Sequence, residues 1–174
     1  QNLLAFARRT NLLADPDFDD GGRVDFVIRV GTGGALVGLE TVERGRRTRI
    51  PRQPAHSNAL EARFLVDNAR YVLGLGPEKT AGRNALCAAT FLEYTQEVAR
   101  TTGDEAVAAV AAFLAQGRRE VLKHRPEAEW TGSEVLTFCY DPDETLKVYE
   151  RDPVVAYWRS LREVRSEATA TCLV

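Results

Sequence analysis

Seven arginines gather in residues 41–70 and form the densest group of side chains that could do chemistry. They are Arg44, Arg46, Arg47, Arg49, Arg52, Arg63 and Arg70. Only Glu43, Glu61 and Asp67 oppose them, so this segment carries a charge of +4 although the whole chain carries −2. Guanidinium groups bind phosphates through paired hydrogen bonds and can read guanine edges. On composition alone, nucleic-acid contact and a solvated arginine-rich loop are equally good interpretations.

The remaining polar residues offer little for catalysis. Two histidines occur, His56 in the basic segment and His124 after a predicted helix, and no hydrolase or metal motif surrounds either. The acidic run 141–144 lacks the spacing of a calcium loop. Catalysis by nucleophile or metal needs a base or a converging ligand set. We therefore expect no enzyme activity, no metal and no cofactor.

The cysteines and the hydropathy pattern exclude other classes of protein. Cys87, Cys139 and Cys172 are scattered, which argues against a disulfide framework or a zinc site, so we expect three buried, unreactive thiols. No apolar run approaches the ~18 residues of a membrane span, and no signal-peptide pattern opens the chain. These features predict a cytoplasmic protein without membrane contact.

The elements that must position the arginines begin with a predicted hairpin. Alternating apolar residues over 23–30 indicate a half-buried strand, and 35–42 is its partner. The glycine-rich segment 31–34 resembles a phosphate loop, but no helix pattern or GK[ST] lysine follows it, which favours a plain turn. The basic loop 44–63 is interrupted by prolines and reads as extended, with a short edge strand near 46–49.

Helical periodicity dominates the rest of the chain. It predicts helices near 82–101, 103–116 and 153–165, with a second hairpin over 134–148 between the last two. The last helix carries one apolar face, formed by Val154, Tyr157, Trp158, Leu161 and Val164. The predicted fold class is α+β, a twisted antiparallel sheet packed with several amphipathic helices. We expect a single domain over 1–174, with the basic loop at 44–63, a helical part at 80–125 and a hairpin and helix at 133–166.

One motif resembles a known family. The segment 50–54 (IPRQP), followed by 64–75 (FLVDNARYVLGL), is similar to the type I-C CRISPR large-subunit family, whose N-terminal region carries a VPxP-type segment and then FLxDNxxYVLG. An opening helix at 2–9 and the later segments 135–138 and 152–158 follow in the family's order. The sequence departs from the family pattern at Ala55–Ala59, where a more basic run is usual. Since family members are longer, the resemblance identifies the chain as the N-terminal region of a larger subunit.

The resemblance implies a non-catalytic DNA-binding module of a type I-C surveillance complex (Cascade). The module recognises the protospacer-adjacent motif (PAM) in duplex DNA and helps to open the target, while guide pairing reads the remaining sequence. The implied partners are duplex target DNA, the crRNA-containing Cascade backbone subunits and a recruited helicase-nuclease. The alternatives are a protein-interaction module that docks on the backbone subunits, and a module that grips the crRNA 5′ end.

The candidate DNA-binding residues follow from the basic zone and the motif. Asn68 can bond adenine edges or minor-groove acceptors, or it can form an Asx-type turn between two apolar runs, and the two roles are equally good. The other candidates are arginines that could contact phosphates or a groove. They are Arg46, Arg47, Arg49, Arg52, Arg63 and Arg70.

Overall fold

The computed structural model describes residues 14–172, so the helix expected at 2–9 lies outside the described residues. The strands are β1 (Phe18–Gly22), β2 (Phe26–Val30), β3 (Leu36–Thr41), β4 (Thr48–Pro51), β5 (Asp67–Asn68), β6 (Val135–Tyr140) and β7 (Asp143–Lys147). The α-helices are α2 (Ala69–Leu73), α3 (Ala81–Thr102), α4 (Glu105–Gln116) and α5 (Asp152–Cys172). The 3₁₀ helices are η1 (Thr32–Gly34), η2 (Glu78–Thr80), η3 (Arg118–Lys123), η4 (Glu127–Glu129) and η5 (Val148–Glu150).

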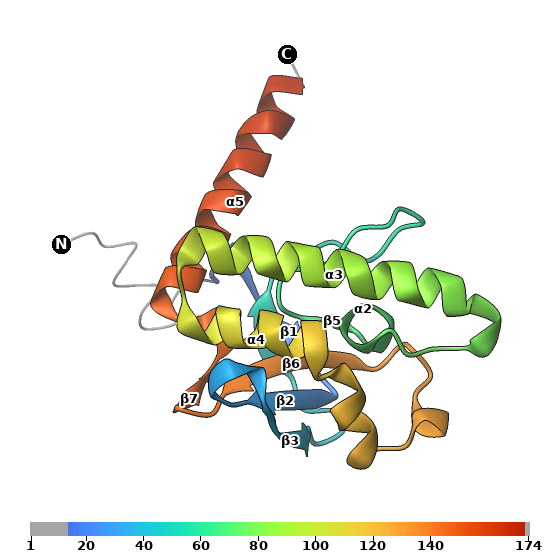
Figure 1. The fold of residues 1–174 in the computed structure, drawn as a ribbon. Helices are drawn as coiled ribbons and strands as arrows, with labels where there is room; N and C mark the ends of the chain where they lie inside the picture. Colours follow the sequence, from blue (N-terminus) through green and yellow to red (C-terminus); the bar gives the residue numbers. More distant parts are fainter. Residues whose placement is uncertain (1–13, 173–174) are drawn as a thin grey trace.

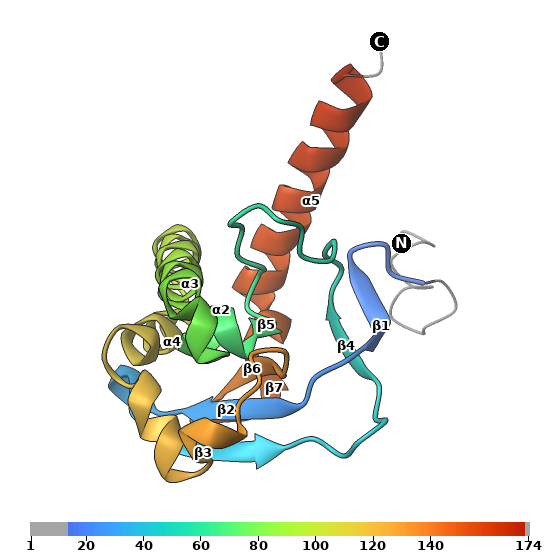
Figure 2. The ribbon, with the colours of Figure 1, turned by 90° about the vertical axis from the view of Figure 1, so that its right-hand side faces the viewer.

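The α+β class is confirmed, with two sheets rather than one. The larger sheet has the order β3-β2-β6-β5, with β7 also paired to β6, and the smaller sheet joins β1 to β4. The expected hairpin β2–β3 is antiparallel, whereas β2 and β6 are parallel. A parallel pair needs a long crossover, and here the chain between the two strands includes α3 and α4. In Figure 2, these helices lie on one side of the larger sheet and the β1–β4 pair on the other.

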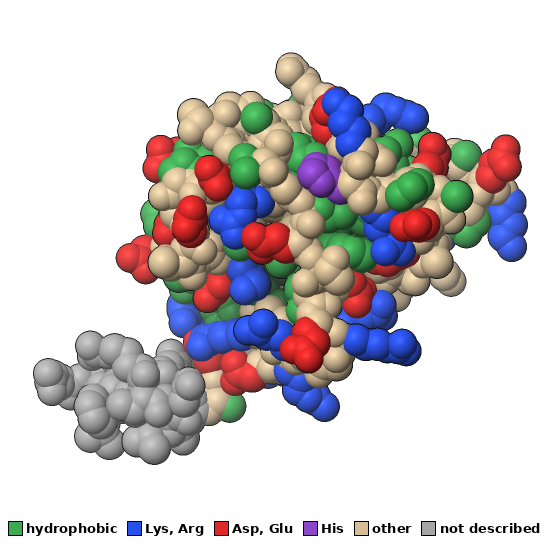
Figure 3. Space-filling view, turned by 90° about the horizontal axis from the view of Figure 1, so that it is seen from below, with side chains coloured by type: hydrophobic (Ala, Val, Ile, Leu, Met, Phe, Trp, Pro, Cys, Tyr) green, Lys and Arg blue, Asp and Glu red, His purple; other side chains and the backbone are tan. Residues whose placement is uncertain are grey.

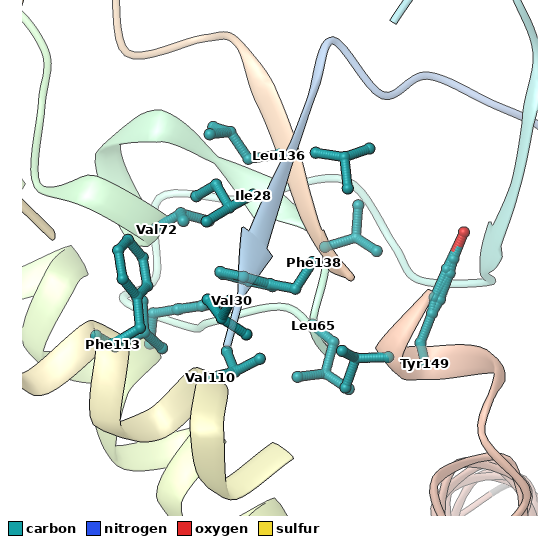
Figure 4. Packing of buried hydrophobic residues seen from close by; sticks show 14 of the residues in the cluster. Ile28, Val30, Leu65, Val72, Val110, Phe113, Leu136, Phe138 and Tyr149 are labelled. Atoms are coloured by element: carbon teal, nitrogen blue, oxygen red, sulfur yellow. The ribbon is translucent and has the colours of Figure 1, made fainter. Parts of the chain in front are cut away.

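The core forms where α3 and α4 cover the larger sheet (Figure 1). Phe113 of α4 packs edge-on against Phe138 of β6, with ring centroids 6.3 Å apart. Phe91 of α3 lies 6.4 Å from the same ring. Figure 4 shows these strands and helices converging through fully buried side chains. Burial of each large apolar side chain stabilises the fold by about 1.5–3 kcal/mol, so this periodic apolar face accounts for the helices that the sequence predicts.

β1 is a strand although its aspartates and glycines (Asp19–Gly22) are residue types typical of a turn. The segment pairs antiparallel with β4, more than twenty residues later in the chain. A Cβ atom on Gly22 would lie 2.4 Å from Cγ1 of Ile50, so the close approach of the two strands requires glycine there. The strand expected near 46–49 is β4, which begins at Thr48.

α5 extends beyond its predicted end at residue 165 and projects from the body (Figure 1). Trp158 is buried as expected, but Val164 is 63% exposed, because the described residues place no element over the last turns of the helix. Cys172 is exposed for the same reason, so the expectation of a buried thiol is wrong there and right for the other two cysteines. No helix among residues 14–172 is long and apolar enough to cross a membrane.

Asp67 anchors the loop that follows β4. The residue is fully buried, yet both carboxylate oxygens accept hydrogen bonds. Oδ1 accepts the Asn68 N–H at 2.7 Å and lies 2.5 Å from His56 Nε2, while Oδ2 accepts the Arg63 N–H at 2.8 Å. The His56 ring stacks on Tyr71 with centroids 4.5 Å apart. These contacts satisfy the buried carboxyl oxygens and tie the loop to the start of α2.

Asn68 begins α2 as its N-cap. Its Oδ1 accepts the backbone N–H of Tyr71 at 3.1 Å, and its backbone pairs with Val135 of β6. Asn68 thus lies in the edge strand of the larger sheet and not at the tip of a loop between the two apolar runs. Of its two predicted roles, the structural Asx-type contact is observed, and base reading stays a prediction.

A second polar cluster holds β1 to α5. The Asp15 carboxylate accepts two hydrogen bonds from Arg159, at 2.9 and 3.0 Å, and one from Arg49 at 2.8 Å. Asp17 accepts a further bond from Arg159 at 2.7 Å, and its carbonyl accepts the Trp158 indole N–H at 2.8 Å. Hydrogen bonding from Arg159 outweighs burial and lowers the pKa of Asp15 to about 2.

We predict that Asp67→Asn destabilises the protein by about 2–3 kcal/mol, although the side-chain volume hardly changes. Both Asp67 oxygens accept hydrogen bonds from backbone N–H groups. The side-chain NH₂ group of the asparagine variant would therefore face an N–H donor in either orientation of the amide. Urea unfolding compared with wild type measures this loss. The control Asn68→Ser keeps a capping oxygen and should cost only a few tenths of a kcal/mol. Equal stability of Asp67→Asn and wild type would contradict the anchoring role.

The Asp15 cluster predicts a defined pH dependence. Because the folded-state pKa of Asp15, about 2, lies below the ordinary value of 3.8, the cluster stabilises the fold above pH 4. This contribution, roughly 2 kcal/mol, disappears as the pH falls from about 4 to 2. The unfolding free-energy difference between wild type and Asp15→Asn should therefore shrink by that amount between pH 6 and pH 2. A difference that stays constant over this range would contradict the prediction.

Candidate nucleic-acid interface

The connection from β3 to β4 carries a compact basic turn, Arg44–Arg47, on the lower side of the molecule (Figure 2). Its backbone is held by a hydrogen bond of 3.1 Å from Arg46 N to Glu43 O. Gly45 has a φ of 86°, the left-handed value that the third position of a type II turn requires. The turn therefore presents guanidinium groups on both sides of the glycine.

Three arginines of the basic turn point their charge at solvent. Arg44, Arg46 and Arg47 are all exposed, and none forms an ion pair with any residue of the described range 14–172. Figure 3 views the molecule from below and shows basic side chains gathered in the lower half of this face, with acidic ones between them. Unpaired guanidinium groups keep their full capacity for phosphate oxygens.

Arg49 and Arg52 were predicted to contact DNA together with the turn, but the fold uses both internally. Arg49 pairs with Asp15 at 2.8 Å and lies over the Phe18 ring, 4.7 Å from its centroid. Arg52 donates to the Phe18 carbonyl at 3.0 Å. Both bonds join β4 to the chain around β1. Two arginines of the predicted basic surface are therefore already bound within the protein, Arg49 to an aspartate and Arg52 to a backbone carbonyl.

The remaining predicted residues lie away from the basic turn. Arg63 is half-buried beside Trp158 and Arg165, on the α5 side of the loop. Arg70 is half-buried in α2, where its guanidinium passes close to Gly76 and Gly132. Among the described residues, the structure thus places Arg46 and Arg47 on one turn, which Arg44 shares. These three arginines lie away from the residues of the motif at 64–75.

A cleft of about 860 Å³ lies beside the basic turn. Its sides are the two connections between the sheets, residues 21–26 and 41–47. Arg125 and Glu134 complete it from a segment about 80 residues later, which no local sequence signal could reveal. Although burial alone would raise the pKa of Glu134, hydrogen bonds from the Thr131–Gly132 segment hold it below its ordinary value. Glu134 thus remains a carboxylate inside the cleft at neutral pH.

The histidines were considered for catalysis on sequence grounds. His56 is engaged with Asp67 and Tyr71, and His124 is exposed after η3. Within the part of the chain that the structure describes, no three His, Cys, Asp or Glu residues converge as a metal-binding group. The chemistry gathered on this surface is therefore that of charge and hydrogen bonding.

One of the comparisons with known proteins supports the motif. A search of curated proteins finds no match. The family model described as CRISPR-associated protein (Cas_Csd1) matches residues 9–174, which includes the basic turn, the cleft and the Asp67 motif. The match covers nearly the whole sequence, so the resemblance inferred from residues 64–75 is confirmed. The chain therefore belongs to the CRISPR-associated Cas_Csd1 family, the large-subunit family of type I-C Cascade.

Proposed function

We propose that the basic turn binds the phosphate backbone of duplex target DNA within the type I-C surveillance complex. The single observation that carries the proposal is the display of Arg44, Arg46 and Arg47, all exposed and without an acidic partner among the described residues. Membership of a Cascade subunit family supplies the context, since such a subunit works with other Cascade components. Phosphate contacts of this kind set affinity and orientation on the duplex.

The proposal extends to recognition of the PAM and to opening of the target beside it. In guide-directed complexes, base pairing reads most of the target, and protein needs to read only a short flanking duplex. The crRNA-containing backbone subunits and a recruited helicase-nuclease are the proposed partners. We propose no catalytic step for this domain, because His56 is engaged in holding the loop through Asp67.

We predict that Arg46→Gln combined with Arg47→Gln weakens binding of all duplexes by the assembled complex. The slope of log K against log salt should fall by about two, one for each lost phosphate contact. Fluorescence anisotropy at several salt concentrations measures both quantities. Lys79→Gln with Arg100→Gln is the matched control, because it removes the same charge from two exposed basic residues, on η2 and α3, that form no ion pair within residues 14–172.

The same titrations separate the alternatives. Loss of affinity for duplexes with and without the PAM supports a backbone contact by the basic turn. Loss of affinity for crRNA alone would instead assign the turn to the 5′ end of the guide. Unchanged affinity and salt slope for both nucleic acids would contradict the proposal and favour a protein-docking role.

A further inference from the structure

The cleft beside the basic turn has the size and lining of a binding site. Its volume of about 860 Å³ falls in the ~300–1,000 Å³ range of small-molecule sites. Val24 and Phe26 line it and are almost fully buried, at 3% and 7% exposure, so its floor is apolar. Arg125 lies over the Phe26 ring, 4.8 Å from the centroid, and adds a flat cationic surface beside this floor.

Charge is separated between the rim and the interior of this cleft. The rim carries the exposed Arg44, Arg46 and Arg47, and Arg47 reaches across so closely that a Cβ atom on Gly21 of β1 would lie 3.0 Å from its Nη1. The interior carries two carboxylates whose side chains are only 28% and 11% exposed, those of Asp25 and Glu134, and each is paired with an arginine of the cleft, Arg23 at 2.7 Å and Arg125 at 3.8 Å.

This separation selects the orientation of a ligand. Phosphate is attracted to the three unpaired guanidinium groups at the rim, whereas the two ion pairs inside carry no net charge, so the phosphate of a ligand is favoured at the rim and its uncharged part inside. Asp25 Oδ2 lies 2.7 Å from Arg23 Nη2 and accepts the Val135 N–H at 2.8 Å, while Oδ1 accepts only from Arg23 Nε, so acceptor capacity remains on Oδ1. The interior therefore suits a flat group that donates hydrogen bonds. An acidic peptide would find no unpaired cation there, and a free phosphate would leave the apolar floor uncovered.

We propose that the cleft accepts one unpaired nucleotide of a bound DNA strand, with its base inside and its phosphates at Arg46 and Arg47. The exocyclic amino group of the base donates to Asp25, in the manner of a carboxylate that reads cytosine. The base ring covers the apolar floor beside Arg125, as bases stack on aromatic and guanidinium surfaces in single-strand sites. The inference rests on the proposed function, because the strand is first held by the basic turn.

Amide NMR of the 174-residue chain tests the cleft directly. The probes are deoxycytidine monophosphate and, separately, inorganic phosphate. The nucleotide should shift amide signals in both connections, residues 23–26 and 41–47. Inorganic phosphate should shift those of 44–47 only. Shifts confined to 44–47 with the nucleotide would overturn the proposal, because they would show that the base stays outside.

A cleft-filling variant gives the second test. Thr41 is exposed on β3 and lines the cleft, so Thr41→Trp should fill it and reduce nucleotide affinity at least tenfold. The matched control is Val37→Trp, an exposed position of the same strand outside the cleft lining, which should keep wild-type affinity. Full nucleotide affinity in Thr41→Trp would contradict the proposal. The wild-type NMR result stands even where Thr41→Trp does not fold.

The two proposals fail separately. If the arginine pair controls duplex binding but the nucleotide never reaches residues 23–26, the cleft inference is wrong and the proposed function stands. If the arginine pair has no effect on duplex binding, the proposed function itself is wrong.

Discussion

The buried carboxylate of Asp67 is the constraint on which the arrangement of this domain depends. Buried carboxyl oxygens must be matched by donors, and the donors come from the loop on one side and from the start of α2 on the other. This anchored loop places the Phe64 ring against the Trp158 ring, and the two ring centroids are 4.8 Å apart. The Trp158 indole in turn bonds the carbonyl of Asp17, next to β1. Through these contacts the Asp67 motif holds the smaller sheet, and the basic turn leads directly into that sheet.

The fold divides the arginines into two groups with different physical roles. Those on β4 and α5 pair with aspartates or carbonyls and join strands to a helix, as Arg49 and Arg159 do around Asp15. Those of the basic turn keep their charge in solvent. A net charge of −2 hides this division, because affinity for a polyanion depends on the local surface and not on the total. Counting arginines in the sequence therefore overstates the free basic surface, because only three of the seven arginines in residues 41–70, those of the basic turn, are exposed and have a guanidinium group without a partner among the described residues.

The sequence predicted the strands and helices that follow from a local hydrophobic pattern. Alternation identified β2 and β3, and 3.6-residue periodicity identified the three long helices, because burial of one face sets both patterns. The sequence did not predict contacts between segments that are far apart in the chain. The aspartates and glycines of β1 read as a turn until β4 supplies the pairing, and Arg125 and Glu134 reach the cleft from far along the chain. The left-handed backbone of Leu65, with a φ of 57°, also has no local signal, since leucine disfavours it.

Hydrogen–deuterium exchange in the assembled complex, with and without a target duplex, tests most directly that the basic turn is the nucleic-acid contact. Amides of residues 43–48 should exchange more slowly when the duplex is bound, because phosphates and the ordered turn shield them. Amides of the loop at 53–62 should keep their rates, since Asp67 anchors that loop with or without DNA. Protection confined to 53–62 or to α2, with none at 43–48, would contradict the assignment of the contact to the basic turn.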